Sequence, residues 1–291
     1  SLLKTLSSSD KVKCLMILTA IKHGGYRVVG LFVNKSPTAF SRTTHFTSED
    51  ARLVGTLLLQ TLIAVENARL TLALKDAQLE TIFRLAVAVE YRDRETGLHI
   101  HRVSDYAGII AEKMGLSPVE IEIIKSAMPM HDIGKIAIPD NILLKPGELT
   151  PEERKVVQQH PVIGARMLKG SSSLVLKAAE IIALHHQERY DGSGYPAGLA
   201  GQAIPLYGRI AAIVDIFDAL SSARVYKSAV SLEESFRLLK EESGRAVDPA
   251  MVKIFLQERA RIEEVYCQYL EKEQRGASLS DKEFWPGGSS Q

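Results

Sequence analysis

The spacing of apolar residues divides the chain into a short β-type segment and a much longer helical part. Residues 26–34 (YRVVGLFVN) alternate in polarity and are rich in β-branched side chains, which predicts a strand. From Thr47 the apolar residues recur with a helical period, and this continues to about Tyr91. From Thr81 onward the pattern favours helices throughout, so we expect a mainly α protein.

The helix predicted from Thr47 is unusually long and has no internal stop signal. Its apolar positions recur at spacings of three, four or seven residues, interrupted by Glu66; they are Leu59, Ile63, Leu70, Leu74 and Ala77. One interpretation is a connector helix that pairs with a second copy in a homodimer. The alternative is an ordinary amphipathic helix that packs on its own domain.

Several helix starts in the second part of the chain can be located from capping boxes. The hydroxyl residue and the glutamate three positions later occur at 117–120, 150–153 and 231–234. Long loops are predicted at Ile138–Thr150 and Tyr190–Pro205, and loops of this length in a compact helical domain are commonly functional. The segment from 273 to the end is expected to be unstructured.

Composition excludes several classes of protein. Lys+Arg 36 against Asp+Glu 35 leaves no large basic surface, so we expect no nucleic-acid polymer as partner. The 2 cysteines have no CxxC spacing, which fits a reducing compartment and argues against a thiolate zinc site. No uninterrupted apolar run reaches the roughly 20 residues of a membrane helix. A cytoplasmic protein without a membrane span is therefore expected.

The candidate chemistry lies in a scattered set of imidazoles and carboxylates. Glu95 and His99 stand four residues apart, so on a helix they share one face. His131 and Asp132 follow an apolar helix, where their burial would be costly without a metal or a partner. A single such residue is more often a cap or a satisfied core residue, but this interpretation weakens as candidates accumulate. The full set is Glu95, His99, His131, Asp132, His160, His186 and Asp215.

The order of these residues and their flanking motifs resembles the HD-GYP branch of the HD phosphohydrolase superfamily. The resemblance rests first on HDIGK at 131–135 and on HHQERYDGSGYP at 185–196. ETGLH at 95–99 with Arg102 resembles another element of the family. Further matches in order are Ile138–Asp140, His160-Pro161, Asp215–Leu220 and Val247–Pro249. The resemblance covers roughly Leu79 to Glu271 and implies a compact helical bundle of the HD superfamily.

The resemblance also implies a metal centre. Its ligands would be His99, His131, Asp132, His160, His186 and Asp215. Asp132 would bridge two ions, and Glu95 would be the additional ligand that permits a third. Imidazole and carboxylate ligands suit iron, manganese or nickel, of which we expect iron or manganese. One position departs from the family pattern: Gln187 stands where a second histidine is common, so either Gln187 or the preceding His185 would have to complete the site.

The family as a class hydrolyses cyclic di-GMP, and the expected reaction is cleavage to linear pGpG and onward to GMP in bacterial signalling. Catalytic roles fall to His131, Asp132 and Lys135, since two ions can activate a water for in-line attack on phosphorus. Substrate contacts are assigned to Lys135, Arg224 and Lys227 as phosphate-binding cations, and to Tyr195 of the GYP loop. That loop is also expected to contact diguanylate cyclases or other signalling domains.

The N-terminal part resembles the end of a GAF sensor domain. The expected organisation is a partial α/β GAF-like segment at 1–71, a connector at 72–78, a phosphodiesterase domain at 79–272 and a tail at 273–291. Two other functions remain open. The chain could act on another cyclic dinucleotide or nucleotide, or it could be a non-catalytic module that binds ligands or partner proteins.

Overall fold

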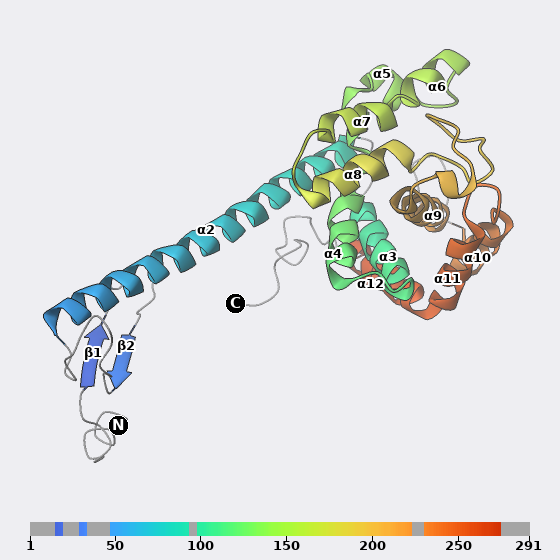
Figure 1. Cartoon of the computed structure of the whole chain (residues 1–291). Helices are drawn as coiled ribbons and strands as arrows, with labels where there is room; N and C mark the ends of the chain where they lie inside the picture. Colours follow the sequence, from blue (N-terminus) through green and yellow to red (C-terminus); the bar gives the residue numbers. More distant parts are fainter. Residues whose placement is uncertain (1–14, 20–28, 34–46, 93–97, 223–229, 275–291) are drawn as a thin grey trace. The chain divides into compact units, whose positions relative to one another are not determined.

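The computed structural model describes residues 15–19, 29–33, 47–92, 98–222 and 230–274 (Figure 1). The chain divides into two compact units, Ser1–Ala77 and Gln78–Gln291. In the first unit, β1 (Leu15–Thr19) pairs antiparallel with β2 (Val29–Val33), with Leu15 opposite Val33. The strand predicted at 26–34 is confirmed for the residues of β2. The remaining residues of the predicted GAF-like segment before Thr47 lie outside the described part of the chain.

Helix α2 (Ser48–Arg92) confirms the long helix predicted from Thr47 to about Tyr91. Its start is fixed by Thr47, whose hydroxyl accepts a hydrogen bond from the backbone N–H of Asp50 at 3.2 Å. The Asp50 carboxylate accepts the N–H of Thr47 in return at 2.8 Å. The two ends of the helix are therefore described, and no proline or glycine pair interrupts it between them.

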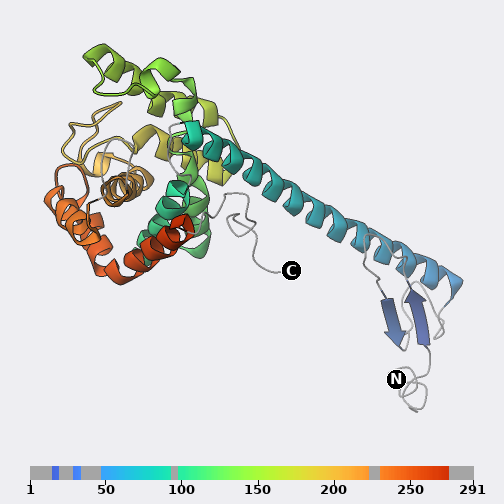
Figure 2. The ribbon, with the colours of Figure 1, turned by 180° about the vertical axis from the view of Figure 1, so that it is seen from behind.

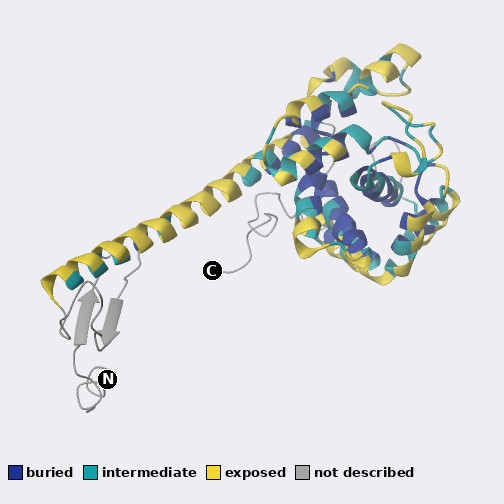
Figure 3. Ribbon diagram, in the orientation of Figure 1, coloured by how far each residue is buried: buried dark blue, intermediate teal, exposed yellow. Residues whose placement is uncertain are grey.

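Most of α2 before residue 80 carries exposed side chains (Figure 3). The exposed large apolar residues are Leu53, Leu57, Leu59, Ile63, Val65, Leu70, Leu72 and Leu74. By length and composition alone, α2 is the one helix in the described residues that could cross a membrane. The absence of a membrane span thus stays a prediction.

The second unit is helical in the part that the structure describes, which confirms the mainly α class (Figure 2). Two deeply buried helices, α3 (His99–Lys113) and α9 (Leu206–Ser221), contribute much of its core. The ring of Tyr106 lies 5.7 Å from that of Phe217 and 6.2 Å from that of Phe255. The other helices are α4 (Pro118–Ala127), η1 (Met128–Met130), η2 (Ile133–Ala137), α5 (Asp140–Leu143), α6 (Pro151–Val157), α7 (His160–Leu168), α8 (Leu174–His185), η3 (Gly201–Ala203), α10 (Leu232–Glu241), α11 (Pro249–Gln257) and α12 (Arg259–Gln274).

Two of the three predicted capping boxes are complete. Ser117 and Thr150 each accept the backbone N–H of the glutamate three residues on, and each glutamate accepts the N–H of the cap residue. At α10 only half of the box forms: Ser231 accepts from the N–H of Glu234, but the Glu234 carboxylate pairs with Arg237 instead. The ion pair between Glu234 and Arg237, one turn further along the helix, therefore takes the place of a hydrogen bond from the backbone N–H of Ser231 to Glu234.

Candidate metal centre

His131 and Asp132 lie where the chain passes from the short helix η1 into η2. The η1 residues Met128, Pro129 and Met130 are buried, so the apolar helix end predicted from the sequence leads directly to this pair. His131 is fully buried, and Asp132 is 7% exposed. The buried environment makes both side chains costly unless a cation or hydrogen-bond partners compensate.

Asp132 meets two distant histidines in what we call the Asp132 cluster, made of Asp132, His160 and His186. His160 is the first residue of α7, and His186 follows the end of α8. The Oδ1 atom of Asp132 lies 3.1 Å from Nε2 of His160 and 3.3 Å from Nε2 of His186. The two Nε2 atoms lie 3.2 Å apart. Ligand atoms held at about 2.1 Å in a tetrahedral site are about 3.4 Å from one another, so these separations fit one shared ion.

The hydrogen bonds at the far side of three histidine rings select the tautomer that metal binding requires. In His131, His160 and His186, Nδ1–H donates to a backbone carbonyl oxygen, which leaves the Nε2 lone pair directed at the centre. The acceptors are Met128 for His131 (3.0 Å), Val157 for His160 (2.7 Å) and Ala183 for His186 (3.0 Å). Imidazole nitrogens gathered this closely around the Asp132 carboxylate suit the binding of a cation.

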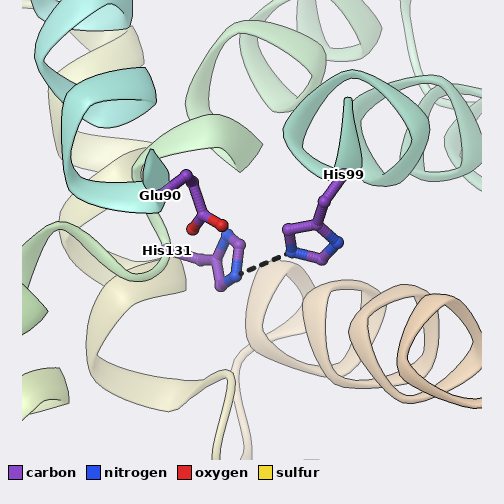
Figure 4. A group of neighbouring side chains, drawn as sticks. All are labelled: Glu90, His99 and His131. Carbon is purple, nitrogen blue, oxygen red and sulfur yellow. Dashed lines mark hydrogen bonds between the residues drawn. The ribbon is translucent and has the colours of Figure 1, made fainter. Parts of the chain in front are cut away.

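A second group, the Glu90 cluster, consists of Glu90, His99 and His131 (Figure 4). One nitrogen or oxygen of each residue lies within 4.8 Å of those of the other two, and all three residues are buried. The Nε2 atoms of His99 and His131 are 3.5 Å apart. Asp215 on α9 lies beside this group, with its Oδ1 3.8 Å from Nε2 of His99.

Asp132 connects the two clusters. Its Oδ2 atom lies 3.4 Å from Nε2 of His131, while Oδ1 faces His160 and His186. Lys135 contacts the same Oδ2 through Nζ at 2.7 Å. Burial alone would raise the pKa of Asp132, but Lys135 and His131 lower it well below its usual range. Asp132 is therefore a carboxylate with an oxygen atom for each cluster.

His99 is held by a buried ionic network behind the centre. Its Nδ1–H donates to Oδ2 of Asp218 at 2.7 Å. Arg102 donates to both oxygens of that carboxylate, at 2.6 and 2.8 Å, and to the hydroxyl of Ser222 at 2.9 Å. Burial would raise the pKa of Asp218, yet Arg102 keeps it well below the usual range. The ionised Asp218 then holds the His99 ring with its Nε2 toward His131.

The GYP loop borders the Asp132 cluster. The ring of Tyr195 lies 6.3 Å from that of His160, edge to face, and burial raises the pKa of Tyr195 to about 12. Tyr195 is thus a neutral phenol at neutral pH. The buried Glu188 carboxylate accepts the backbone N–H groups of Ala197 (2.9 Å) and Leu199 (3.0 Å), which fixes the far side of the loop.

The structure brings together His99, His131, Asp132, His160 and His186, with Asp215 and Lys135 next to them. Glu95, Arg224 and Lys227 lie outside the described residues. His185 belongs to neither cluster; its Cβ lies close to Gly208 of α9, and burial lowers the pKa of its imidazole. The backbone carbonyl of Gln187 accepts the N–H of Tyr195 at 3.2 Å.

Sequence reasoning missed Glu90, which the structure places in the Glu90 cluster at 2% exposure. A signal was available: a carboxylate ends the apolar run LAVAVE of α2 at 85–90 and precedes His99 by nine residues. This signal places Glu90 at the end of an apolar run, but it does not relate Glu90 to His99, which shares no helical face or adjacent position with it.

A metal fits this donor set. The Asp132 cluster offers one carboxylate and two imidazole nitrogens, and the Glu90 cluster offers the same combination. Such mixed nitrogen and oxygen donors suit divalent iron, manganese or zinc. Asp132 Oδ1 and Oδ2 together reach both groups, so the donors could hold two neighbouring divalent ions.

Helices that converge on paired imidazoles and carboxylates define a helical protein whose buried donor set fits divalent metal ions. Residues 39–251 match the family model described as HD domain, and the chain belongs to this family. It is 46% identical over 222 residues to the cyclic di-GMP phosphodiesterase response regulator RpfG of Xanthomonas campestris, covering 76% of this chain and 57% of that protein. It is 48% identical over 192 residues to a cyclic di-GMP phosphodiesterase of Thermotoga maritima, covering 66% and 52%.

One solved structure supports the fold independently. A cyclic GMP-AMP-specific phosphodiesterase of V. cholerae aligns with a TM-score of 0.50 at 21% identity, covering 72% of this chain and 55% of that chain. At this identity the likeness concerns the fold alone. The chain spans about half the length of the curated relatives it matches.

Replacing Gly134 with alanine should disturb the centre through the backbone. A Cβ atom there would lie 2.0 Å from the carbonyl oxygen of His160 and 2.6 Å from the N atom of Gly164, so η2 and α7 would have to separate. We expect a loss of about 1–3 kcal/mol in the free energy of unfolding by urea and weaker metal binding. Gly55→Ala, with nothing near the new methyl group, is the control; equal behaviour of the two variants would contradict this prediction.

Proposed function

We propose that this chain is a metal-dependent phosphodiesterase of the HD-GYP branch that hydrolyses cyclic di-GMP to linear pGpG and onward to GMP. The observation that carries the proposal is the pair of adjoining imidazole and carboxylate clusters joined by Asp132. The names of relatives at 46% and 48% identity support the substrate. The proposed phosphodiesterase domain is 79–272, preceded by a partial GAF-like segment at 1–71 and a connector at 72–78.

The proposed ligands are His99, His131, Asp132, His160, His186 and Asp215, for two ions of iron or manganese. Glu95 is proposed as the additional ligand for a third ion. Divalent ions bound here would lower the pKa of a coordinated water to near neutrality, which supplies a nucleophile for the phosphodiester. The histidines orient the centre through their Nδ1–H bonds, so little reorganisation is needed when substrate arrives.

Lys135 is proposed to bind a non-bridging phosphate oxygen. Its Nζ lies 2.7 Å from Asp132 Oδ2, so the ammonium borders the place where the phosphodiester must sit. With an ion at that oxygen in its place, Lys135 would be available to the phosphate. Arg224 and Lys227 are proposed as further phosphate contacts. Tyr195, a neutral phenol, can donate a hydrogen bond to the nucleotide.

The connector helix and the GYP loop are proposed as contact surfaces. Among the exposed apolar residues of α2, Leu59, Ile63, Leu70 and Leu74 follow one another at spacings of four and seven residues, which supports a homodimer through this helix. Residues around Tyr195 are proposed to contact diguanylate cyclases or other signalling domains. We further propose that this protein is cytoplasmic and acts in bacterial second-messenger signalling.

The test is anaerobic purification with Mn²⁺ or Fe²⁺, metal analysis, and chromatography of the products from cyclic di-GMP. Formation of pGpG that requires the metal is the expected result. Parallel reactions with 3′3′-cyclic GMP-AMP and cyclic di-AMP decide the substrate: faster cleavage of either would transfer the proposal to that dinucleotide. No cleavage of any cyclic dinucleotide with bound metal would favour a non-catalytic binding module.

A further inference from the structure

Glu90 is a buried carboxylate inside the metal centre that the proposed ligand set leaves without a role. It lies in the last turn of α2, two residues before the helix ends at Arg92, and is 2% exposed. A carboxylate is seldom buried to this extent unless a cation neutralises it. Within the Glu90 cluster, a protonated imidazole or a metal ion can supply such a positive charge.

The position of Glu90 is set by packing on both sides of it along α2. Phe83 and Val87, two turns and one turn earlier, form a small buried cluster with Ile100 of α3. Two residues later, Arg92 donates to the carbonyl oxygens of Lys135 (2.9 Å) and Ile138 (2.5 Å). The end of α2 is thus fastened to α3 and to the η2 turn that follows Asp132. Donors held by rigid elements in this way are typical of metal ligands.

The geometry of the Glu90 cluster suits one shared ion. The Nε2 atoms of His99 and His131 are 3.5 Å apart, close to the roughly 3.4 Å expected for two ligands of a tetrahedral ion. A carboxylate oxygen of Glu90 lies within 4.8 Å of a ligand atom of each histidine (Figure 4). The terminal torsion of a glutamate is broad, so the carboxylate can turn to meet an ion without movement of the helix.

We propose that Glu90 is a carboxylate ligand of the ion held by His99 and His131, so that α2 itself supplies part of the metal centre. This proposal rests on the two-ion centre of the proposed function. The ion of the Glu90 cluster would then have one carboxylate and two imidazole donors, the same combination as in the Asp132 cluster. Asp215, with Oδ1 3.8 Å from His99, borders the same ion from α9.

The competing role for Glu90 is an ion pair with a protonated His131, which needs no metal. The two roles differ in what happens when Glu90 loses its charge. If Glu90 only pairs with His131, the substitution removes that pair but both ions still bind. If Glu90 is a ligand, the ion of the Glu90 cluster is weakened while the ion of the Asp132 cluster stays.

The experiment measures Mn²⁺ binding by the metal-free full chain under anaerobic conditions, by calorimetry and by elemental analysis after dialysis. For Glu90→Gln we expect the stoichiometry to fall from two ions to one, with at least about 100-fold weaker binding of the lost ion. Residues that only hydrogen-bond to ligands change metal affinity by roughly 10–100-fold, so the expected loss lies at or above the upper end of that range. Glu80→Gln, a half-exposed residue of the same helix that pairs with Arg84, is the control and should keep both ions.

Electron paramagnetic resonance gives a second readout. Two Mn²⁺ ions bridged by Asp132 are magnetically coupled, whereas a single ion gives an uncoupled six-line signal, which we expect for Glu90→Gln. Hydrogen exchange of 86–92 should slow when the wild-type chain binds Mn²⁺ but not in this variant. If Glu90→Gln fails to fold, Glu90→Leu replaces it, since an apolar side chain of similar size removes the cost of burying a charge.

Two ions with unchanged affinity in a folded Glu90 variant would overturn the proposal while leaving the phosphodiesterase function intact. A wild-type chain that binds two ions but cleaves no cyclic dinucleotide would remove the function and leave the ligand assignment standing. A wild-type chain that binds no divalent ion would overturn both.

Discussion

Asp132→Ala is expected to abolish cyclic dinucleotide hydrolysis, with at least about a 1,000-fold loss of kcat/KM, or about 4 kcal/mol of transition-state stabilisation. The reason is that Asp132 is the one described carboxylate that reaches both clusters, with Oδ1 at 3.1 and 3.3 Å from two histidines and Oδ2 at 3.4 Å from a third. Its removal would take one donor from each of the two proposed ions. The measurement combines initial rates of pGpG formation with metal content per chain.

The variant should nevertheless fold, because removing a buried carboxylate also removes its desolvation cost. Circular dichroism and urea unfolding of the metal-free chain check this. Asp76→Ala, an exposed aspartate on α2, is the control and should leave rates and metal content unchanged. Substantial hydrolysis by a metal-depleted Asp132→Ala chain would refute the proposed mechanism, since it would show that the reaction does not need the shared carboxylate.

Most of the candidate ligand residues could be predicted from the sequence, but their arrangement in space could not. His131 and Asp132 were recognisable because two polar residues directly follow an apolar helix, and His160 and His186 because they stand in motifs of recognisable order. Which histidine meets which oxygen depends on how α7 and α8 pack, and no local pattern encodes that. The Nε2 distances of 3.2 and 3.5 Å could only come from the folded chain.

Glu90 and Asp218 show why other parts of the centre were beyond sequence reasoning. Glu90 ends an apolar helical run, and neither a shared helical face nor an adjacent position relates it to His99 in the sequence. Asp218 stands three residues after Asp215, within the segment Asp215–Leu220 that resembles the family. The resemblance gave a role to Asp215 but none to Asp218. Its pairing with His99, 119 positions earlier, follows from α3 lying against α9. Contacts between residues so far apart depend on tertiary packing rather than on periodicity.

Arg102→Met is expected to have the largest effect on stability, a loss of about 3–5 kcal/mol in the free energy of unfolding. Arg102 is 4% exposed and donates twice to Asp218, which is 1% exposed. Without the guanidinium, Asp218 is left as a buried charge with the imidazole of His99 as its nearest donor. The measurement is urea unfolding of the metal-free chain, with Arg84→Met as the control because the Arg84–Glu80 pair is solvent-exposed and such pairs contribute at most about 1 kcal/mol.

A double-mutant cycle separates the stranded charge from lost packing. Adding Asp218→Asn to Arg102→Met removes the charge but keeps the shape of the side chain, so the double variant should be more stable than Arg102→Met alone. The oxygen of the introduced amide can still accept the Nδ1–H of His99, and metal binding should therefore recover in part. Additive losses in the cycle would contradict the network, because they would mean that Arg102 and Asp218 stabilise the fold independently of each other.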